Sequence, residues 1–424
     1  TGHQRHKETV QKHHRIPFIY PVNEKLKTIQ ASHTVAVKGM GLTFIDAILA
    51  LTEGRGGTFE KTEDGKLRYH PSSNEPKAIF PFSKSGLPML PKHNFTDDKS
   101  KQTLYIENAK LFKKNKLSFK KDLFPLLAQD MAFAYYTTLF LFEKEVLTYH
   151  PDYTKAENQI ASFHQKYPQY PPFSLQEILE PKMNPTTSIH KHVVDYLTAF
   201  TVEKNQNILH EAQLRAAAVW RKTSPVFNDF YKFSGLDAVS HEEFDSKYFG
   251  KLNRVAYGPP PENLKKILAL AEAGMLDFQY AKNPKITLQE TQTVLNNGTT
   301  TISCDILIDA RIPKNDMDME ASGLFRNLCE NQLARPYINQ DTTSRYAPGI
   351  LEINRNGNLI NAHGELENIT LYGTPTEGIV HDNDTLSRTR NNFVGLWASE
   401  ALKYITLKKH ETKDKSSKTI ACSQ

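Results

Sequence analysis

The chain has 424 residues, enough for two or three domains, and 39% of them are hydrophobic and 24% charged, as in globular proteins. Its net charge of +6 favours anionic ligands such as phosphates, but it is too small to indicate a nucleic-acid partner, and we expect none. No apolar run approaches the ~20 residues that a membrane-spanning helix needs, so we expect no membrane partner.

The three cysteines, Cys304, Cys329 and Cys422, are an odd number at wide spacing. Neither a zinc site nor a disulfide framework follows from this spacing, and a reducing compartment explains it. We therefore expect a cytoplasmic protein without a metal site. Residues 1–14 are polar and rich in histidine, and because these histidines lack carboxylate partners we expect them to be solvated.

A strand, a glycine turn and a helix are predicted in direct succession at residues 34–51. Val35 to Val37 predict a short buried strand, Gly39 and Gly41 form the turn, and the apolar Leu42 to Leu51 predict a buried helix. Glycines at this place let the backbone approach the phosphates of a dinucleotide, which then face the helix N–H groups and dipole. The alternative is a purely structural turn, because the third small residue of the GxGxxG fingerprint is replaced by Phe44.

Nucleotide binding at this turn would involve its backbone N–H groups and one hydroxyl. The predicted cofactor-binding residues are Gly39, Met40, Gly41, Leu42 and Thr43. The predicted helix ends in a glycine-rich stretch that contains Arg55. This arginine favours NADPH if it binds a 2′-phosphate, and otherwise it is an ordinary surface arginine.

A hairpin and a proline-rich loop are predicted next. Residues 58–69 alternate as a hairpin that turns at Asp64-Gly65. The loop that follows contains Ser83-Lys84-Ser85-Gly86, and it either covers a ligand or rigidly connects two elements. Lys84 is a second candidate for binding a cofactor phosphate.

Helical periodicity dominates residues 120–280. It predicts helices over residues 124–142, 193–220 and 259–276, and we interpret their aromatic residues as core. Strand patterns return at residues 286–294 and 299–308, a hairpin is predicted at 349–359, and a last helix at 391–407. The order α/β, helical, α/β predicts a helical insertion in a nucleotide-binding fold rather than three independent domains.

Several segments resemble the FAD- and NAD(P)-binding flavoproteins that are related to flavin-dependent N-hydroxylating monooxygenases. They are Thr1-Gly2-His3, residues 35–57 with their GMGLTFID stretch, residues 69–88, residues 305–313 (DILIDARIP) and residues 371–378 (LYGTPTEG). The resemblance implies a Rossmann-like dinucleotide-binding fold with a large helical insertion and the remnant of a second, FAD-binding domain.

Two departures from that family are visible. Its members hold FAD on an N-terminal strand–GxGxxG–helix unit, which this chain lacks, so we expect the chain to be part of a longer protein. Lys84 stands where the family pattern predicts arginine, which keeps the positive charge but not a bidentate phosphate contact.

The resemblance also implies a division of the chain. Its parts are residues 1–30 as the end of the FAD domain and the crossing segment, 31–120 as the first half of the NAD(P) domain, 121–280 as the helical insertion, 281–315 as the return strands, 316–410 as the C-terminal part of the FAD domain, and 411–424 as a disordered tail.

By this resemblance the protein is an FAD- and NAD(P)H-dependent oxidoreductase, monooxygenase-like, that acts on a small molecule of unknown identity. Thr376, Glu377 and Gly378 would lie near the flavin, although Glu377 could instead cap its turn. The sequence identifies no catalytic base and no oligomeric state, and it lacks the motifs of hydrolases and P-loop NTPases. The alternatives are a non-enzymatic nucleotide-binding or interaction module and, less favoured, a nucleotide-dependent transferase.

Overall fold

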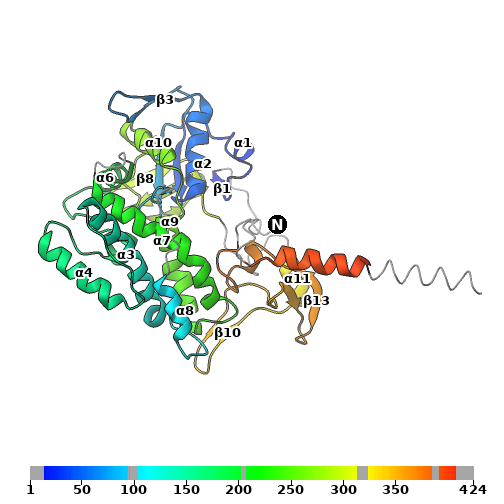
Figure 1. Cartoon of the computed structure of the whole chain (residues 1–424). Helices are drawn as coiled ribbons and strands as arrows, with labels where there is room; N and C mark the ends of the chain where they lie inside the picture. Colours follow the sequence, from blue (N-terminus) through cyan, green and yellow to red (C-terminus); the bar gives the residue numbers. More distant parts are fainter. Residues whose placement is uncertain are drawn as a thin grey trace, which may run out of the picture.

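The computed structural model describes residues 14–93, 95, 104–201, 207–312, 323–383 and 391–406. The predictions for Thr1-Gly2-His3 and for the tail at 411–424 lie outside these residues. Figure 1 shows a parallel sheet with its covering helix at the top, a helical block at the lower left, and smaller strands at the right, from which the last helix projects. The chain is therefore a mixed α/β protein with a parallel sheet and many helices.

The parallel sheet has the strand order β1-β9-β2-β5, where the strands are β1 (Arg15–Ile16), β9 (Ile306–Asp309), β2 (Thr34–Lys38) and β5 (Ala78–Phe82). Each neighbouring pair is parallel, so the carboxyl ends of the strands share one edge. Side chains of β2 alternate between the two faces. Val35 and Val37 join the large core, whereas Ala36 packs with Phe80 and Leu295 in a smaller cluster.

Helix α2 (Leu42–Leu51) has the bounds that the sequence predicts. Phe44, Ile48 and Leu51 are fully buried at helical spacing, which explains why this apolar run forms a helix against the sheet. The chain passes from α2 to β5 through the short helix η1 (Glu53–Arg55) and the hairpin of β3 (Thr58–Lys61) and β4 (Leu67–His70). The predicted hairpin at 58–69 is confirmed. Between β1 and β2 lies the single turn α1 (Val22–Lys25).

The helical block continues the large core of the sheet without a break. Its elements are η2 (Tyr105–Leu111), η3 (Phe119–Leu123), α3 (Phe124–Phe142), α4 (Tyr153–Lys166), α5 (Leu175–Leu179), α6 (Ile189–Thr201), α7 (Ile208–Tyr231), α8 (Ala238–Glu243), η4 (Phe244–Tyr248), α9 (Phe249–Ala256) and α10 (Pro261–Glu272). The single helix predicted at 193–220 is wrong, because α6 and α7 are separate. Asn207 starts α7 by accepting the backbone N–H of Leu209 on its side-chain oxygen (3.0 Å).

An antiparallel sheet follows, formed by β6 (Lys285–Leu288), β7 (Thr293–Asn296) and β8 (Thr301–Cys304). The strand predicted at 299–308 is divided between β8 and β9, so the chain changes sheets at Asp305. The carboxylate of Asp305 accepts the backbone N–H and the hydroxyl of Thr34, both at 2.8 Å, and so fixes the start of β2.

The C-terminal part has its own small apolar core, separate from the large one. Its elements are α11 (Leu324–Glu330), β10 (Asn339–Gln340), β11 (Arg345–Tyr346), β12 (Asn358–Ile360), β13 (Leu366–Thr370), η5 (Thr374–Thr376) and a last helix at 393–406. The hairpin predicted at 349–359 forms as a short antiparallel pair around the bridge between Ile353 and Leu359, and on its other side β12 pairs with β13. Among the described helices, none has both the length and the apolar character needed to cross a membrane.

Candidate nucleotide-binding site

The carboxyl edge of the parallel sheet is the place where the predicted phosphate turn lies. From β2 the chain crosses to β5 on one side, and after the helical block it returns as β9 on the other side of β2. In open parallel sheets, ligands bind outside the carboxyl ends of the strands at such a reversal of strand order. The segments at this edge are Gly39–Thr43, Ser83–Gly86 and Asp309–Arg311.

Gly39 lies where the backbone that follows β2 comes close to the backbone that follows β9. Its N–H donates to the carbonyl oxygen of Phe82 (2.8 Å), and its φ is +108°, in the region that favours glycine. A Cβ at this position would lie 2.8 Å from Cγ of Arg311 and 3.0 Å from the carbonyl oxygen of Ala310. The residues that follow β9 therefore leave room only for glycine at position 39.

Gly41 has a different role, because it starts α2 at φ −94° with open space around it. A Cβ added at Gly41 would have one heavy atom within 4 Å, Sδ of Met89, at 3.9 Å. Among the described residues no side chain caps this helix, so its first N–H groups are left for water or an anion. Because Gly41 has no side chain, the approach to those N–H groups stays clear.

The other predicted residues of the turn face different ways. Leu42 is about half exposed, whereas the side chains of Met40 and Thr43 are buried. The Thr43 hydroxyl interacts with the phenol of Tyr20, which itself donates to Asp46 (2.5 Å). Burial and the hydrogen bond to Asp46 raise the pKa of Tyr20 to about 12. At Met40 and Thr43, only backbone groups are therefore suited to bind a ligand.

Lys84 is exposed in the turn that follows β5. The hydroxyl of Ser83 accepts the N–H of Gly86 (3.0 Å) and fixes this turn. Gly86 has φ +73°, and a Cβ there would lie 2.7 Å from Cβ of Lys282. Lys282 thus packs directly beneath the turn that carries Lys84.

Asp309 and Arg311 complete this edge, although the sequence alone does not assign them to it. Arg311 donates from Nε and Nη2 to the two carboxylate oxygens of Asp309 at 2.8 and 2.7 Å. This bidentate hydrogen bonding raises the pKa of Arg311, and the guanidinium stays partly exposed beside Gly39. The signal for this pair was the DAR sequence at the end of a predicted strand.

Arg55 lies away from the turn. It follows the C-terminal end of α2, whereas Gly41 precedes its N-terminal end, and ten helical residues span about 15 Å. Its guanidinium donates to the carbonyl oxygens of Asn74 and Leu26, both at 3.1 Å. Arg55 therefore joins two loops in this structure and is not brought together with Gly39 and Gly41.

Thr376, Glu377 and Gly378 form a tight loop in the C-terminal part. The hydroxyl of Thr376 donates to the carbonyl oxygen of Gly373 (2.7 Å) and accepts from the side-chain nitrogen of Asn383 (2.6 Å). The carboxylate of Glu377 accepts the backbone N–H of Asn383, as expected for a residue that caps its turn. Gly378 has φ +105° and lies against Pro348. These contacts engage the side chains of Thr376 and Glu377 within the protein.

Helix α7 and its surroundings hold this loop in place, which the sequence alone does not reveal. The side chain of Asn228 accepts the backbone N–H of His381 (2.8 Å). Asp382 accepts from the hydroxyls of Ser224 and Tyr257, both at 3.1 Å. The ring of His381 is surrounded by the aromatic rings of Trp220, Phe227, Tyr231, Phe244 and Phe249, with centroids 5.2–5.7 Å away.

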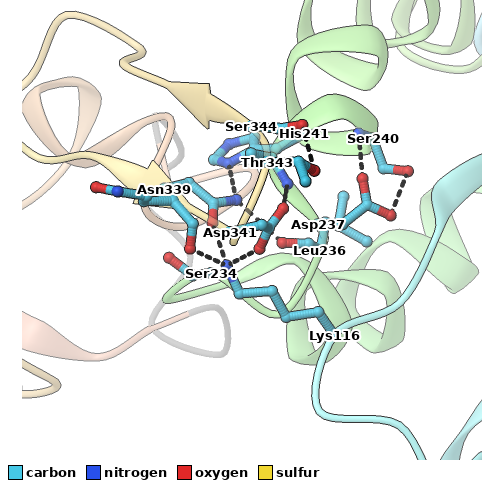
Figure 2. A network of polar contacts seen from close by, with 12 residues as sticks. Lys116, Ser234, Leu236, Asp237, Ser240, His241, Asn339, Asp341, Thr343 and Ser344 are labelled. Carbon is cyan, nitrogen blue, oxygen red and sulfur yellow. Dashed lines mark hydrogen bonds and ion pairs between the residues drawn. The ribbon is translucent and has the colours of Figure 1, made fainter.

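A polar network also joins the helical block to the C-terminal strands, as Figure 2 shows. Lys116 donates to the side-chain oxygen of Asn339 (2.7 Å) and pairs with Asp341 (2.6 Å). Asp341 accepts the backbone N–H of Ala238 (2.6 Å) at the start of α8. Asn339, fully buried, contacts Nδ1 of His241 (3.1 Å). These contacts fix β10 against α8.

His241 is fully buried in this network and carries a perturbed pKa. Its Nε2 lies 2.8 Å from the hydroxyl of Tyr231 and 3.5 Å from Asp245. Burial lowers the pKa of His241 to about 4, the charge of Lys116 adds to this effect, and a backbone hydrogen bond with Gly378 opposes it. Burial outweighs the nearby Asp245, so the imidazole is neutral in the folded protein.

The neutral His241 makes stability depend on pH. An unfolded histidine has a pKa near 6.5, so between about pH 7 and 4 the unfolded chain binds more protons than the folded protein does. The free energy of unfolding therefore decreases as the pH is lowered through this range. The lowered pKa of His241 predicts that the free energy of unfolding decreases by about 2 kcal/mol from pH 7.5 to pH 5.0. Urea unfolding at both pH values should show a smaller loss in His241→Gln than in the wild type. His70→Gln, on the exposed hairpin, is the control, and equal losses in all three proteins would contradict a neutral His241.

Other features of the described residues are less suited to chemistry. A hollow of about 830 Å³ lies between the β3–β4 hairpin and the end of α10, lined by residues such as Glu60, Lys66 and Glu272, and it includes none of the residues at the carboxyl edge. Among the residues that the structure describes, no three side chains are grouped as metal ligands.

Sequence comparisons find the chain similar to a nitrosuccinic acid synthase and to two L-aspartate N-monooxygenases. It is 24% identical over 389 residues to the nitrosuccinic acid synthase of Aspergillus oryzae, covering 85% of this chain and 58% of that protein. It is 24% identical over 426 residues to an L-aspartate N-monooxygenase (nitrosuccinate-forming) of Streptomyces davaonensis, covering 92% and 64%. The enzyme of the same name from Streptomyces cremeus is 24% identical over 417 residues, covering 91% and 62%.

No protein-family model matches the sequence. The chain spans about three fifths of the length of the curated relatives it matches. The chain is thus similar to N-monooxygenases through most of its own length.

Proposed function

We propose that this chain belongs to an FAD- and NADPH-dependent oxidoreductase that N-hydroxylates a small amino acid. The observation that carries the proposal is the glycine turn at the switch point of the parallel sheet, between strands β2 and β9, in a chain similar to N-monooxygenases. In this proposal the four-stranded sheet is Rossmann-like and the helices from η2 to α10 form an insertion in it. The C-terminal part from α11 onward belongs to the flavin domain.

The substrate class follows from the relatives. Two of them are named as L-aspartate N-monooxygenases, so we propose L-aspartate or a related amino acid with a free amine as the substrate. A binding or interaction module, the alternative from the sequence, has no specific support in the structure.

The residues at the carboxyl edge fit a dinucleotide. Gly39 and Gly41 would let the pyrophosphate approach the first N–H groups of α2, and Arg311 would add positive charge beside Gly39. The bound NADPH would supply reducing equivalents and FAD the oxygen-activating chemistry. The loop at Thr376–Gly378, fixed by its own hydrogen bonds and by α7, would present backbone groups to the flavin ring.

The turn after β5 favours NADPH over NADH. In dinucleotide-binding sheets, an acidic residue near this position binds the ribose 2′-hydroxyl of NADH, whereas a cation accommodates the 2′-phosphate of NADPH. Here Ser83, Lys84 and Ser85 follow the strand, and Lys282 packs beneath them. We therefore propose Lys84, rather than Arg55, as the residue that selects NADPH.

Lys84→Glu tests this preference. Charge-assisted hydrogen bonds contribute about 1.5–3 kcal/mol, so we expect the Kd for NADPH to rise more than about tenfold while the Kd for NADH changes little. Lys66→Glu, an exposed lysine on the β3–β4 hairpin, is the matched control. Calorimetric titration with both nucleotides gives the result, and an equal change for NADPH and NADH would show that Lys84 does not face the 2′-phosphate.

Turnover distinguishes the proposed function from its alternatives. The whole oxidoreductase to which we assign this chain is expected to oxidise NADPH steadily when FAD and L-aspartate are added. Tight NADPH binding without oxidation would favour the module, and a product built from the nucleotide itself would favour a transferase.

A further inference from the structure

The proline-rich loop that follows β5 returns to the glycine turn at Met89. Sδ of Met89 lies 3.9 Å from the position that a Cβ would take at Gly41, which is an ordinary van der Waals separation. A ligand atom seated at that position would therefore touch the thioether. Met89 is only partly buried, whereas Leu87 and Leu90 on either side of it are buried in the large core. The loop is thus anchored by its leucines and presents its methionine to the turn.

The helical block fixes the backbone of this loop from the other side. The N–H of Leu90 donates to the carbonyl oxygen of Arg254 in α9 (2.9 Å). A Cβ at Gly258, in the connection between α9 and α10, would lie 1.7 Å from the carbonyl oxygen of Leu90 and 3.2 Å from Cβ of Met89. No side chain fits between the loop and this connection, so the two backbones are in direct contact.

The side chain of Arg254 joins the loop to two further helices. It is 7% exposed, and its Nη1 donates to the hydroxyl of Tyr196 in α6 (2.7 Å) and to the carbonyl oxygen of Pro88 (3.4 Å). Its Nη2 donates to the carbonyl oxygens of Ile178 and Leu179 at the end of α5 (3.1 and 3.0 Å). One planar guanidinium therefore holds three segments together, and a lysine ammonium has neither its fork nor its reach.

We propose that Met89 contacts a dinucleotide bound at the glycine turn, and that Arg254 is the residue that positions Met89. This inference rests on the proposed function. A thioether has no N–H to donate to a phosphate oxygen, so Met89 would touch the uncharged ribose next to the pyrophosphate. NADPH and NADH share that ribose, so Met89 contributes to the affinity for both nucleotides, whereas Lys84 is proposed to select between them. The loop is thus a rigid connection and a cover at the same time.

Methyl NMR of the full chain tests the contact directly. The sequence has seven methionines, so selective ¹³C labelling of their methyl groups gives few signals, which single substitutions assign. Saturation with NADPH should shift the Met89 signal. Met275 is the internal control, because it is also partly buried but its carbonyl oxygen accepts the N–H of Ile79 near the start of β5, away from the carboxyl edge.

Calorimetry on the same sample separates the two proposals. NADPH that binds without shifting the Met89 signal would overturn the contact and leave the proposed function standing. Absence of NADPH binding to the unsubstituted chain would contradict the proposed function, and this inference with it.

Met89→Ala should raise the Kd for NADPH and the Kd for NADH by about three- to tenfold each, because the ribose loses contact with several apolar atoms. Met275→Ala is the matched control and should change neither Kd. Titration calorimetry measures both constants. Unchanged affinities in folded Met89→Ala, or a change for NADPH alone, would overturn the contact with the shared ribose.

A double-mutant cycle tests the positioning role of Arg254. Arg254→Lys should raise both Kd values about threefold, but less than about 1.5-fold further when Met89 is already alanine. An equal rise in both backgrounds would show a merely structural role and contradict the positioning. Tyr196→Phe, which removes one acceptor of Arg254 and keeps the ring, is the milder variant and should show the same dependence on Met89 if Arg254→Lys does not fold.

Discussion

Gly41→Val is expected to weaken NADPH binding by more than about tenfold in a protein that still folds. A valine here would place a branched side chain in front of the first N–H groups of α2, where the pyrophosphate is proposed to bind, and a loss of about 1.4 kcal/mol corresponds to tenfold. The backbone of Gly41 has a negative φ, and the space around its Cβ position is open, so the fold itself tolerates a side chain. Isothermal titration calorimetry measures the change.

One outcome would contradict this prediction. An unchanged Kd for NADPH in folded Gly41→Val would remove the assignment of the turn to a phosphate. Gly250→Ala in α9 is the control. Nothing lies within 4 Å of the position that a Cβ would take at Gly250, so this substitution should leave both folding and the affinity for NADPH unchanged.

Gly39→Ala is expected to destabilise the protein by about 2–4 kcal/mol. The φ of +108° strains any residue with a Cβ, and the added atom would press on Arg311 and on the carbonyl oxygen of Ala310, which is backbone and cannot move aside. Gly41→Ala, two residues further, should cost about 1 kcal/mol or less. Chemical unfolding of the two variants measures the difference.

Equal unfolding free energies for Gly39→Ala and Gly41→Ala would contradict the close approach of β9 to the turn. The comparison is sharp because the two glycines occupy one motif in the sequence but two different environments in the fold. Gly39 is needed for packing at the sheet edge, and Gly41 keeps the end of the helix accessible.

Local elements were predictable where neighbouring residues determine them. Leu42–Leu51 forms a helix because its apolar residues repeat at helical spacing, and the hairpin turning at Asp64-Gly65 follows from turn chemistry. The separation of α6 from α7 was missed, because both helices carry apolar residues at compatible spacing. The division of residues 299–308 at Asp305 was missed because the carboxylate that marks it acts on Thr34, which is distant in sequence.

The candidate site was predictable in part. The glycine turn is a local motif, whereas Asp309 and Arg311 reach it through the pairing of β9 with β2, which no local pattern reveals. Arg55 is close to Gly41 in sequence, yet the length of α2 separates them. The contacts of α7 with the loop at Thr376–Gly378 are likewise non-local, so sequence periodicity identified the helix but not its partner.

Hydrogen–deuterium exchange of the chain with and without NADPH tests the central claim most directly, because it locates the bound nucleotide. We predict slower exchange of the backbone amides at residues 38–43 and 83–86, where the ends of β2 and β5 and the start of α2 share one edge of the sheet. NADPH binding that leaves these amides unchanged, or that protects the hollow between the β3–β4 hairpin and α10 instead, would contradict the account.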